Sequence, residues 1–210
     1  MDSKALAKMM LSLQAKGCHN INLVSPTHVV PYILEALEAA VNMGLYLPLV
    51  YNSGGYDSLE TLQLLDGIID IYMPDMKYSD EKVAEQLSGI KDYPQVNRAA
   101  IKEMHRQVGD LEIDEQRVAR RGLLVRHLVL PDRLAGTQET VRFLAQEVSS
   151  NTYLNIMAQY HPCYKAFTIP SLARPLHRQE FDEAIDLAHQ QGLYRLDKDN
   201  FPLPLRLILG

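Results

Sequence analysis

Short apolar stretches alternate with amphipathic stretches along this sequence, and that alternation constrains the fold more than any other feature. The apolar stretches predict strands at residues 20–24, 47–52, 68–73, 122–131 and 153–160. The amphipathic stretches predict helices at residues 2–16, 29–43, 58–65, 79–87, 94–108, 137–148 and 177–191, and Thr137 is the expected N-cap of the helix that follows it. Strands that alternate with helices form βαβ units. We therefore expect an α/β fold with a parallel sheet, either a partial (β/α) barrel or an open, doubly wound sheet.

Length and composition indicate a soluble protein with one core. The 210 residues form one expected domain, 1–210, with 47% hydrophobic and 22% charged residues. A net charge of −5 argues against nucleic acid or an anionic membrane as the partner. The two cysteines, Cys18 and Cys163, fit free thiols in a reducing cytoplasm, which is the expected location.

Polar side chains gather where the expected strands end. Asn52 closes one strand, Asp75 and Lys77 follow the next, Arg126 interrupts an apolar strand and His161 follows the last. Ligand sites of parallel α/β folds lie at these carboxyl ends. Each residue also has a purely structural explanation when it is considered alone. Asn52 would be a turn residue, Asp75 and Arg126 would form a structural ion pair, and His127 would be a histidine packed in the core. Taken together, they predict a site for a small zwitterionic or phosphorylated molecule.

Four stretches resemble the radical S-adenosylmethionine proteins related to the pyruvate formate-lyase activating enzyme. They are HNINLVSPTHVVPYILEAL, LPLVYNSGGYDSLETLQLLDGIIDIYMPDMKY, AIKEMHRQVGDL and RRGLLVRHLVLP. The resemblance covers residues 2 to 195 and is to the activating-enzyme-like branch. It implies a partial parallel (β/α) barrel that lacks its first strand in this chain. It also implies S-adenosylmethionine and a [4Fe–4S] cluster as cofactors, and reductive cleavage to a 5′-deoxyadenosyl radical.

The resemblance also assigns roles to single residues. Asn52 is expected near the methionine portion of S-adenosylmethionine, and Asp75 and Lys77 are expected ligand contacts. Arg126 corresponds to an arginine that reaches the cofactor, and His161 to the histidine of the last strand. The family's Gly-Gly-Glu, which holds the ammonium group, is replaced here by LVSPTH, so Ser25, Thr27 or His28 is expected to serve.

The family's cluster motif, C-x-x-x-C-x-x-C, is absent from the sequence. A [4Fe–4S] cluster needs thiolates, so the chain contributes no metal ligand and is expected to be catalytically incomplete alone, with the cluster only in a longer protein. A glycyl-radical enzyme is the protein partner that the resemblance suggests. Two alternatives stay open. One is a degenerate protein that only binds S-adenosylmethionine or a nucleoside. The other is a metal-independent barrel lyase or hydrolase that uses Asp75, Lys77 and His161 as acid and base.

A missing first strand would leave residues 20–24 as an apolar sheet edge. We expect a homodimer across that edge, cover by the apolar tail at 201–210, or poor solubility.

The coding DNA upstream of Met1 provides the test of the expected cluster segment. We expect it to continue in frame with a strand followed by C-x-x-x-C-x-x-C. A longer chain with these residues should turn brown with iron and sulfide and cleave S-adenosylmethionine when reduced, and the 210-residue chain should do neither. An in-frame stop with no cysteine motif nearby would contradict this expectation and favour the degenerate binding protein.

Overall fold

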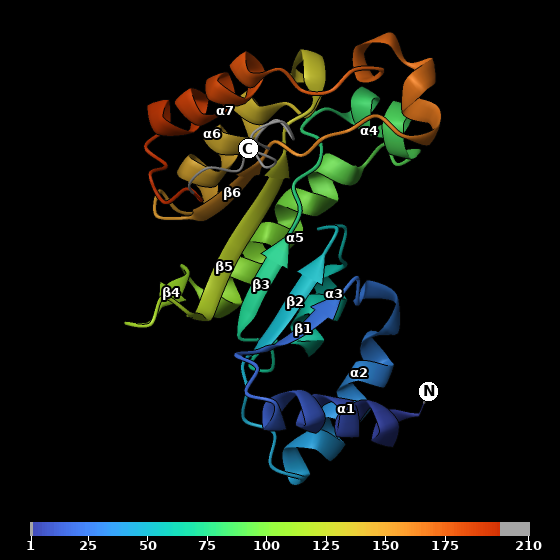
Figure 1. Cartoon of the computed structure of the whole chain (residues 1–210), viewed down its shortest axis with the longest axis vertical. Coiled ribbons are helices and arrows are strands. Elements are labelled where there is room, and N and C mark those ends of the chain that lie inside the picture. The colour runs from blue at the N-terminus through green and yellow to red at the C-terminus, as the bar shows by residue number, and fades with distance from the viewer. Residues whose placement is uncertain (1, 198–210) are drawn as a thin grey trace, which may run out of the picture. The chain divides into compact units, whose positions relative to one another are not determined.

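The computed structural model describes residues 2–197, in which helices and strands alternate as expected (Figure 1). The strands are β1 (Ile21–Val24), β2 (Leu49–Ser53), β3 (Ile71–Pro74), β4 (Glu112–Ile113), β5 (Ala119–Leu128) and β6 (Tyr153–Met157). The helices are α1 (Ser3–Ala15), α2 (Val30–Asn42), α3 (Leu59–Leu64), α4 (Glu81–Ser88), α5 (Tyr93–Val108), α6 (Thr137–Phe143) and α7 (Arg178–Gln190). The α/β class with mostly parallel strands is confirmed.

Side chains at the helix ends explain why several helices begin and stop where they do. Asp2 accepts a hydrogen bond from the Ala5 amide at the start of α1, and Ser58 accepts one from the Thr61 amide at the start of α3. Asp80 caps α4 in the same way, which satisfies amides that have no partner inside a first helical turn. Gly89 ends α4 with a φ of 70°, a left-handed conformation that costs glycine little.

The fold divides into two compact units. Unit 1 comprises residues 2–74 and 96–124, and unit 2 comprises residues 75–95 and 125–197. Helix α5 and strand β5 contribute residues to both units.

Unit 1 contains the parallel part of the sheet. Its strands follow the order β1-β2-β3-β5-β4, and β1, β2, β3 and β5 pair in parallel. The short β4 pairs with β5 in antiparallel fashion, so the two strands form a small hairpin. The rings of Tyr51 and Tyr72, from neighbouring strands, meet edge to face in the core with centroids 5.7 Å apart. Helix α1 packs on α2 (Figure 1).

Unit 2 is built around the second half of β5. Arg126 forms a parallel bridge with Asp75 on one side, and on the other the Val129 amide donates to the Met157 carbonyl at the end of β6. Helices α6 and α7 pack on each other. The buried apolar side chains of this unit include Val125, Val141, Leu144, Leu154, Ile156, Phe181 and Ala184.

Two local expectations differ from the structure. Gly136, not Thr137, is the N-cap of α6, because the Thr137 hydroxyl bonds to His127 instead of to its own helix. The helix expected to reach residue 148 changes to π-helix over Leu144–Val148. The tail at 201–210, for which docking was expected, lies outside the described residues.

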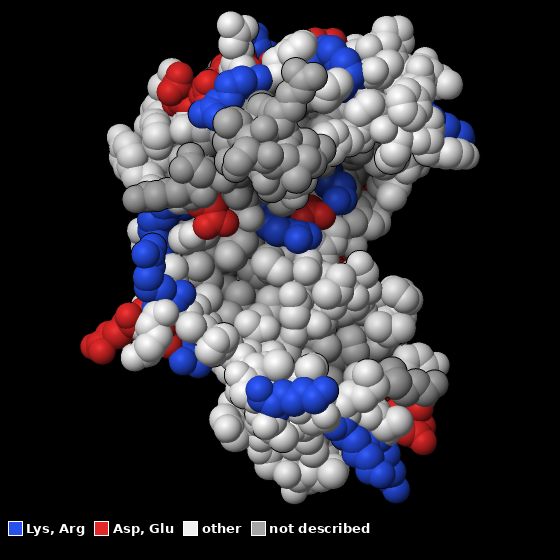
Figure 2. Space-filling view, in the orientation of Figure 1, with Lys and Arg blue, Asp and Glu red and all other residues white. Residues whose placement is uncertain are grey.

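The two edges of the unit 1 sheet differ in charge. The β4 edge is two residues long, irregular in register and flanked by Asp110, Asp114 and Glu115. The β1 edge has no charged residue between residues 20 and 27, and Figure 2 shows uncharged surface over it. The Ile21 and Ser25 amides donate to the β2 side, at Pro48 and Asn52. Strand alternation therefore directs the amides of Asn22 and Val24 to the other side of β1, on which no strand of residues 2–197 pairs.

We expect this uncharged edge to pair with a second copy of the chain. A twofold axis at Leu23 would set each Asn22 opposite Val24 of the second copy, with no like charges facing each other. We expect concentration-dependent dimers in sedimentation velocity, and we expect Val24→Lys to abolish them by placing two ammonium groups at the interface. Ile113→Lys, at the β4 edge, is the matched control and should dimerise like the parent. A parent that is monomeric at every concentration, or a Val24→Lys variant that still dimerises, would contradict the edge interface.

Candidate functional site

An ion cluster lies where the chain leaves β3 in unit 2. Lys77 Nζ is 2.5 Å from Asp75 Oδ2, and Arg126 Nη2 is 2.7 Å from Asp75 Oδ1. The Asp75 side chain is 15% exposed, that of Arg126 26% and that of Lys77 44%. Two cations therefore share one carboxylate, and the cluster carries a net positive charge. Three of the residues expected at the site are thus brought together, although β3 ends at Pro74 and Asp75 follows it as an isolated bridge.

The backbone that carries these side chains is held by hydrogen bonds on both sides. The Met76 amide donates to the Arg126 carbonyl at 2.8 Å. The Lys77 amide donates to the hydroxyl of Tyr93, which in turn donates to the Asp75 carbonyl. Tyr93 is almost fully buried at the start of α5. Tyr93 was not predicted as a site residue, because no local sequence pattern indicates that a helix tyrosine reaches a strand end.

His127 completes this backbone network from inside the core. Its ring is fully buried, with Nδ1 2.8 Å from the Met76 carbonyl oxygen and Nε2 2.9 Å from the Thr137 hydroxyl. Burial lowers the pKa of His127, which favours the neutral ring. The expectation of a packed core histidine is confirmed.

A cavity of about 360 Å³ opens beside the ion cluster. Its polar lining is Asp75, Lys77, Arg126 and Gln159, and its less polar wall is Met76, Tyr78, Leu128, Leu130, Met157 and Tyr160. Among the described residues, no atom accepts a hydrogen bond from the buried Nε of Arg126. The cavity therefore combines two cationic side chains and a carboxylate with an apolar, tyrosine-containing wall, in the size range of small-molecule sites.

Met157 at the end of β6, with Gln159 and Tyr160 after it, lines this cavity, and the expected residue His161 does not. His161, the next residue, is exposed to solvent. The Tyr160 hydroxyl donates to the Leu172 carbonyl at 2.8 Å, and burial raises the pKa of Tyr160.

The remaining expected residues lie in unit 1, at the ends of β1 and β2. The Ser25 amide donates to the Asn52 carbonyl at 2.8 Å, and Ser25 has a left-handed φ of 52°. Thr27 donates its hydroxyl to Asp57, so it is held next to the same strand ends. Unit 1 therefore brings Ser25, Thr27 and Asn52 together.

Asp57, which the sequence analysis did not single out, organises these strand ends. Its buried carboxylate accepts hydrogen bonds from the hydroxyls of Thr27, Tyr51 and Ser53 at 2.7–2.9 Å. Burial, and then the nearby Asp57 charge, raise the pKa of Tyr51. The Ser53 hydroxyl also accepts from the Gly55 amide, which fixes the turn after Asn52.

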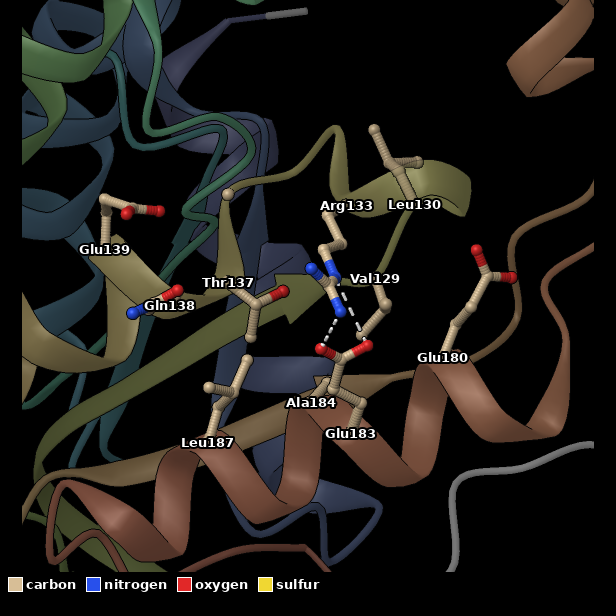
Figure 3. Close-up of a pocket in the computed structure, with 11 residues that line it drawn as sticks. Val129, Leu130, Arg133, Thr137, Gln138, Glu139, Glu180, Glu183, Ala184 and Leu187 are labelled. Atoms are coloured by element: carbon tan, nitrogen blue, oxygen red, sulfur yellow. Dashed lines mark hydrogen bonds and ion pairs between the residues drawn. The ribbon is translucent and has the colours of Figure 1, made fainter.

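A second cavity in unit 2 is too small for a comparable ligand. It has a volume of about 90 Å³ and lies between the segment after β5 and helices α6 and α7 (Figure 3). That volume corresponds to about three water molecules. Figure 3 shows the guanidinium of Arg133 facing the carboxylate of Glu183, with which it is paired. This space fits water or a small ion and not a cofactor.

The segment after β5 is held in an unusual conformation by ion pairs. Asp132 and Arg133 have left-handed φ values of 56° and 59°, a conformation with a backbone cost for residues other than glycine. The Arg174 guanidinium bonds to Asp132 and, through both terminal nitrogens, to Glu180. Glu180 also accepts from the amides of Asp132 and His177. These hydrogen bonds lower the pKa of Glu180 to about 2, and the bond from Arg174 has the largest effect.

The lowered pKa of Glu180 predicts a loss of stability in acid. A carboxyl whose folded-state pKa is depressed stabilises the fold above its unfolded value, near 4.5, and loses that contribution as the pH falls toward about 2. Because Glu180 is partly exposed, we expect a contribution of about 1–2 kcal/mol. Arg174→Met should remove this contribution at neutral pH. The free energy of unfolding, measured with urea, should then fall less steeply between pH 4.5 and pH 2 than it does in the parent.

Arg178→Met, which breaks an exposed helix pair with Asp182, is the control for that measurement and should leave the acid limb unchanged. An Arg174→Met variant with the parent's acid limb would show that Glu180 is not held by Arg174.

Comparisons with known proteins give one match by sequence and one by structure. The sequence is 31% identical over 176 residues to MJ0674, an uncharacterized protein of Methanocaldococcus jannaschii, which covers 83% of this chain and 47% of that protein. The chain therefore spans about half the length of this relative. The structure matches the crystal structure of a domain of pyruvate-formate lyase-activating enzyme from Bacteroides vulgatus, with a TM-score of 0.59 and 11% identity. That match covers 86% of this chain and 98% of that domain. No family model matches the sequence.

The structural match confirms the expected fold class, an α/β fold like that of an activating-enzyme domain. At 11% identity it shows the fold alone. Among residues 2–197, no helix is long and apolar enough to cross a membrane.

Proposed function

We propose that the cavity beside Asp75 binds S-adenosylmethionine, and that the chain is the cofactor-binding part of a radical S-adenosylmethionine enzyme. The observation that carries the proposal is the pairing of one carboxylate with two cations beside a wall that contains Tyr78 and Tyr160. S-adenosylmethionine carries a carboxylate, an ammonium, a sulfonium and an aromatic base. The fold of an activating-enzyme domain and the PDMK and YNSGG resemblances support the same reading.

Each polar group of the cavity has a partner on such a ligand. The Arg126 guanidinium and the Lys77 ammonium suit a carboxylate, and Asp75 suits a positively charged group. The tyrosine rings offer surface for an aromatic base and for a cationic sulfonium. The roles proposed for Ser25, Thr27, Asn52 and His161 rest on the resemblance.

The chain's own residues do not fit an iron–sulfur cluster. It has two cysteines, Cys18 and Cys163, which lie in different units, and the family motif needs three thiolates. Among the described residues, no group of three or more His, Cys, Asp or Glu side chains is placed to hold a metal. No radical step is therefore derived for this chain, and activation of a glycyl-radical enzyme is proposed only for a protein that also carries a cluster.

The cysteine count favours a second candidate, a protein that binds S-adenosylmethionine or a nucleoside without turning it over. Both candidate functions use the same cavity for the ligand. They differ in whether an iron–sulfur cluster in a longer protein reacts with the bound S-adenosylmethionine. A metal-independent acid–base reaction has less support, because Asp75 is engaged by two cations and His161 is exposed.

Isothermal titration with S-adenosylmethionine tests the proposed ligand. We expect the parent to bind weakly and Arg126→Met to lose about 10- to 100-fold in affinity, the usual worth of a hydrogen bond to a charged group. Asp75→Asn should weaken binding as well, because it leaves Lys77 and Arg126 without their counter-charge.

Arg133→Met is the matched control, since it removes an arginine from the small cavity of Figure 3. It should bind like the parent. Titrations with methionine and with adenosine would show which half of the ligand the cavity recognises. A parent that binds none of the three ligands, or an Arg126→Met variant with unchanged affinity, would overturn the proposal.

A further inference from the structure

The positions of Asp75 and Lys77 depend on the single residue between them. The Met76 backbone sets the direction in which both side chains leave the chain, because it joins their two α-carbons. Its amide donates to the Arg126 carbonyl, and its carbonyl accepts from Nδ1 of His127 at 2.8 Å. The side chain of Met76 is buried, so its peptide has no access to water as a substitute partner.

The tautomer of His127 follows from its two partners. The Met76 carbonyl can only accept, so Nδ1 carries the proton. In the neutral ring, Nε2 is then an acceptor, and the Thr137 hydroxyl donates to it at 2.9 Å. Thr137 is the first residue of α6, so the ring is anchored to a helix that packs on α7.

Strand alternation separates the two neighbouring polar residues of β5. Arg126 and Leu128 line the cavity, and His127 between them points to the other face, toward Thr137. His127 therefore cannot contact a ligand in the cavity. Its ring reaches the backbone of residues 75–77 through the Met76 carbonyl.

We infer that His127 is a positioning residue, which fixes the Met76 peptide and so holds Asp75 and Lys77 at the geometry required for ligand binding. This inference deepens the proposed function and rests on it for the ligand. Its structural part, the control of the residue 75–77 backbone by one ring nitrogen, stands on the contacts of His127 alone.

Two substitutions test the roles of the two ring nitrogens separately, because each keeps a nitrogen at only one of the two positions. The amide nitrogen of His127→Asn can take the place of Nδ1 and keep the donor to Met76. The amide of His127→Gln can take the place of Nε2 and keep the contact with Thr137, but it leaves the Met76 carbonyl without a donor. Both variants lose one buried hydrogen bond and some ring packing, so we expect similar losses of thermal stability. Thr137→Val removes the other contact and serves as a third variant.

Amide hydrogen exchange gives a readout that needs no ligand. In His127→Gln we expect the Met76 and Lys77 amides to exchange about tenfold faster, relative to the slowest core amides of the same variant. In His127→Asn and Thr137→Val these two amides should keep the protection of the parent. A uniform increase across unit 2 in all three variants would mean that His127 only stabilises the core, and would overturn the inference.

Titration with S-adenosylmethionine gives the second readout. We expect His127→Gln to bind about 10- to 100-fold more weakly than the parent, as is usual for residues that orient a ligand-binding group, and His127→Asn to stay within about threefold. Equal losses in the two variants would overturn the positioning role. If the parent binds no S-adenosylmethionine, the proposed ligand fails, and the exchange rates of Met76 and Lys77 still decide whether His127 holds this backbone.

Discussion

The candidate site depends on how the backbone at the end of β3 obtains its hydrogen bonds. Beyond Pro74, pairing with β5 is reduced to the Asp75–Arg126 bridge, and Met76 is buried there, so the remaining peptide groups need other partners. Tyr93 and His127, two buried side chains from outside β3, supply the missing partners. Because the peptide groups are fixed in this way, the charged side chains of Asp75 and Lys77 can project into a cavity without unravelling the strand end.

The same principle operates separately in unit 1. There, the buried carboxylate of Asp57 collects three hydroxyls and fixes the turn after Asn52. In each unit, the residues named by the family resemblance are held by others that the resemblance does not name. This arrangement is typical of ligand sites, where the supporting contacts determine how precisely the binding groups are placed.

The proposed cofactor binding and the cysteine content lead to different expectations about activity. The fold resembles that of an activating-enzyme domain, and the proposed S-adenosylmethionine binding rests on the cavity at Asp75. The two cysteines do not suit its cluster, and the chain spans 47% of the length of MJ0674. Cofactor binding and radical chemistry are therefore separate questions for this chain, and the first can be answered with the 210 residues alone.

The sequence by itself determined the order of helices and strands, the parallel α/β class and the grouping of Asp75, Lys77 and Arg126. Hydrophobic periodicity and strand-end polarity are local signals, so they can be read without a structure. Tertiary structure alone decided which groups hold that cluster in place. Tyr93, His127 and Thr137 act across 10 to 51 positions of sequence, at distances that no spacing rule predicts. Tertiary structure also decided that Gly136, and not Thr137, is the N-cap of α6. The Thr137 hydroxyl, which local propensity assigns to the helix end, bonds to a buried nitrogen of His127.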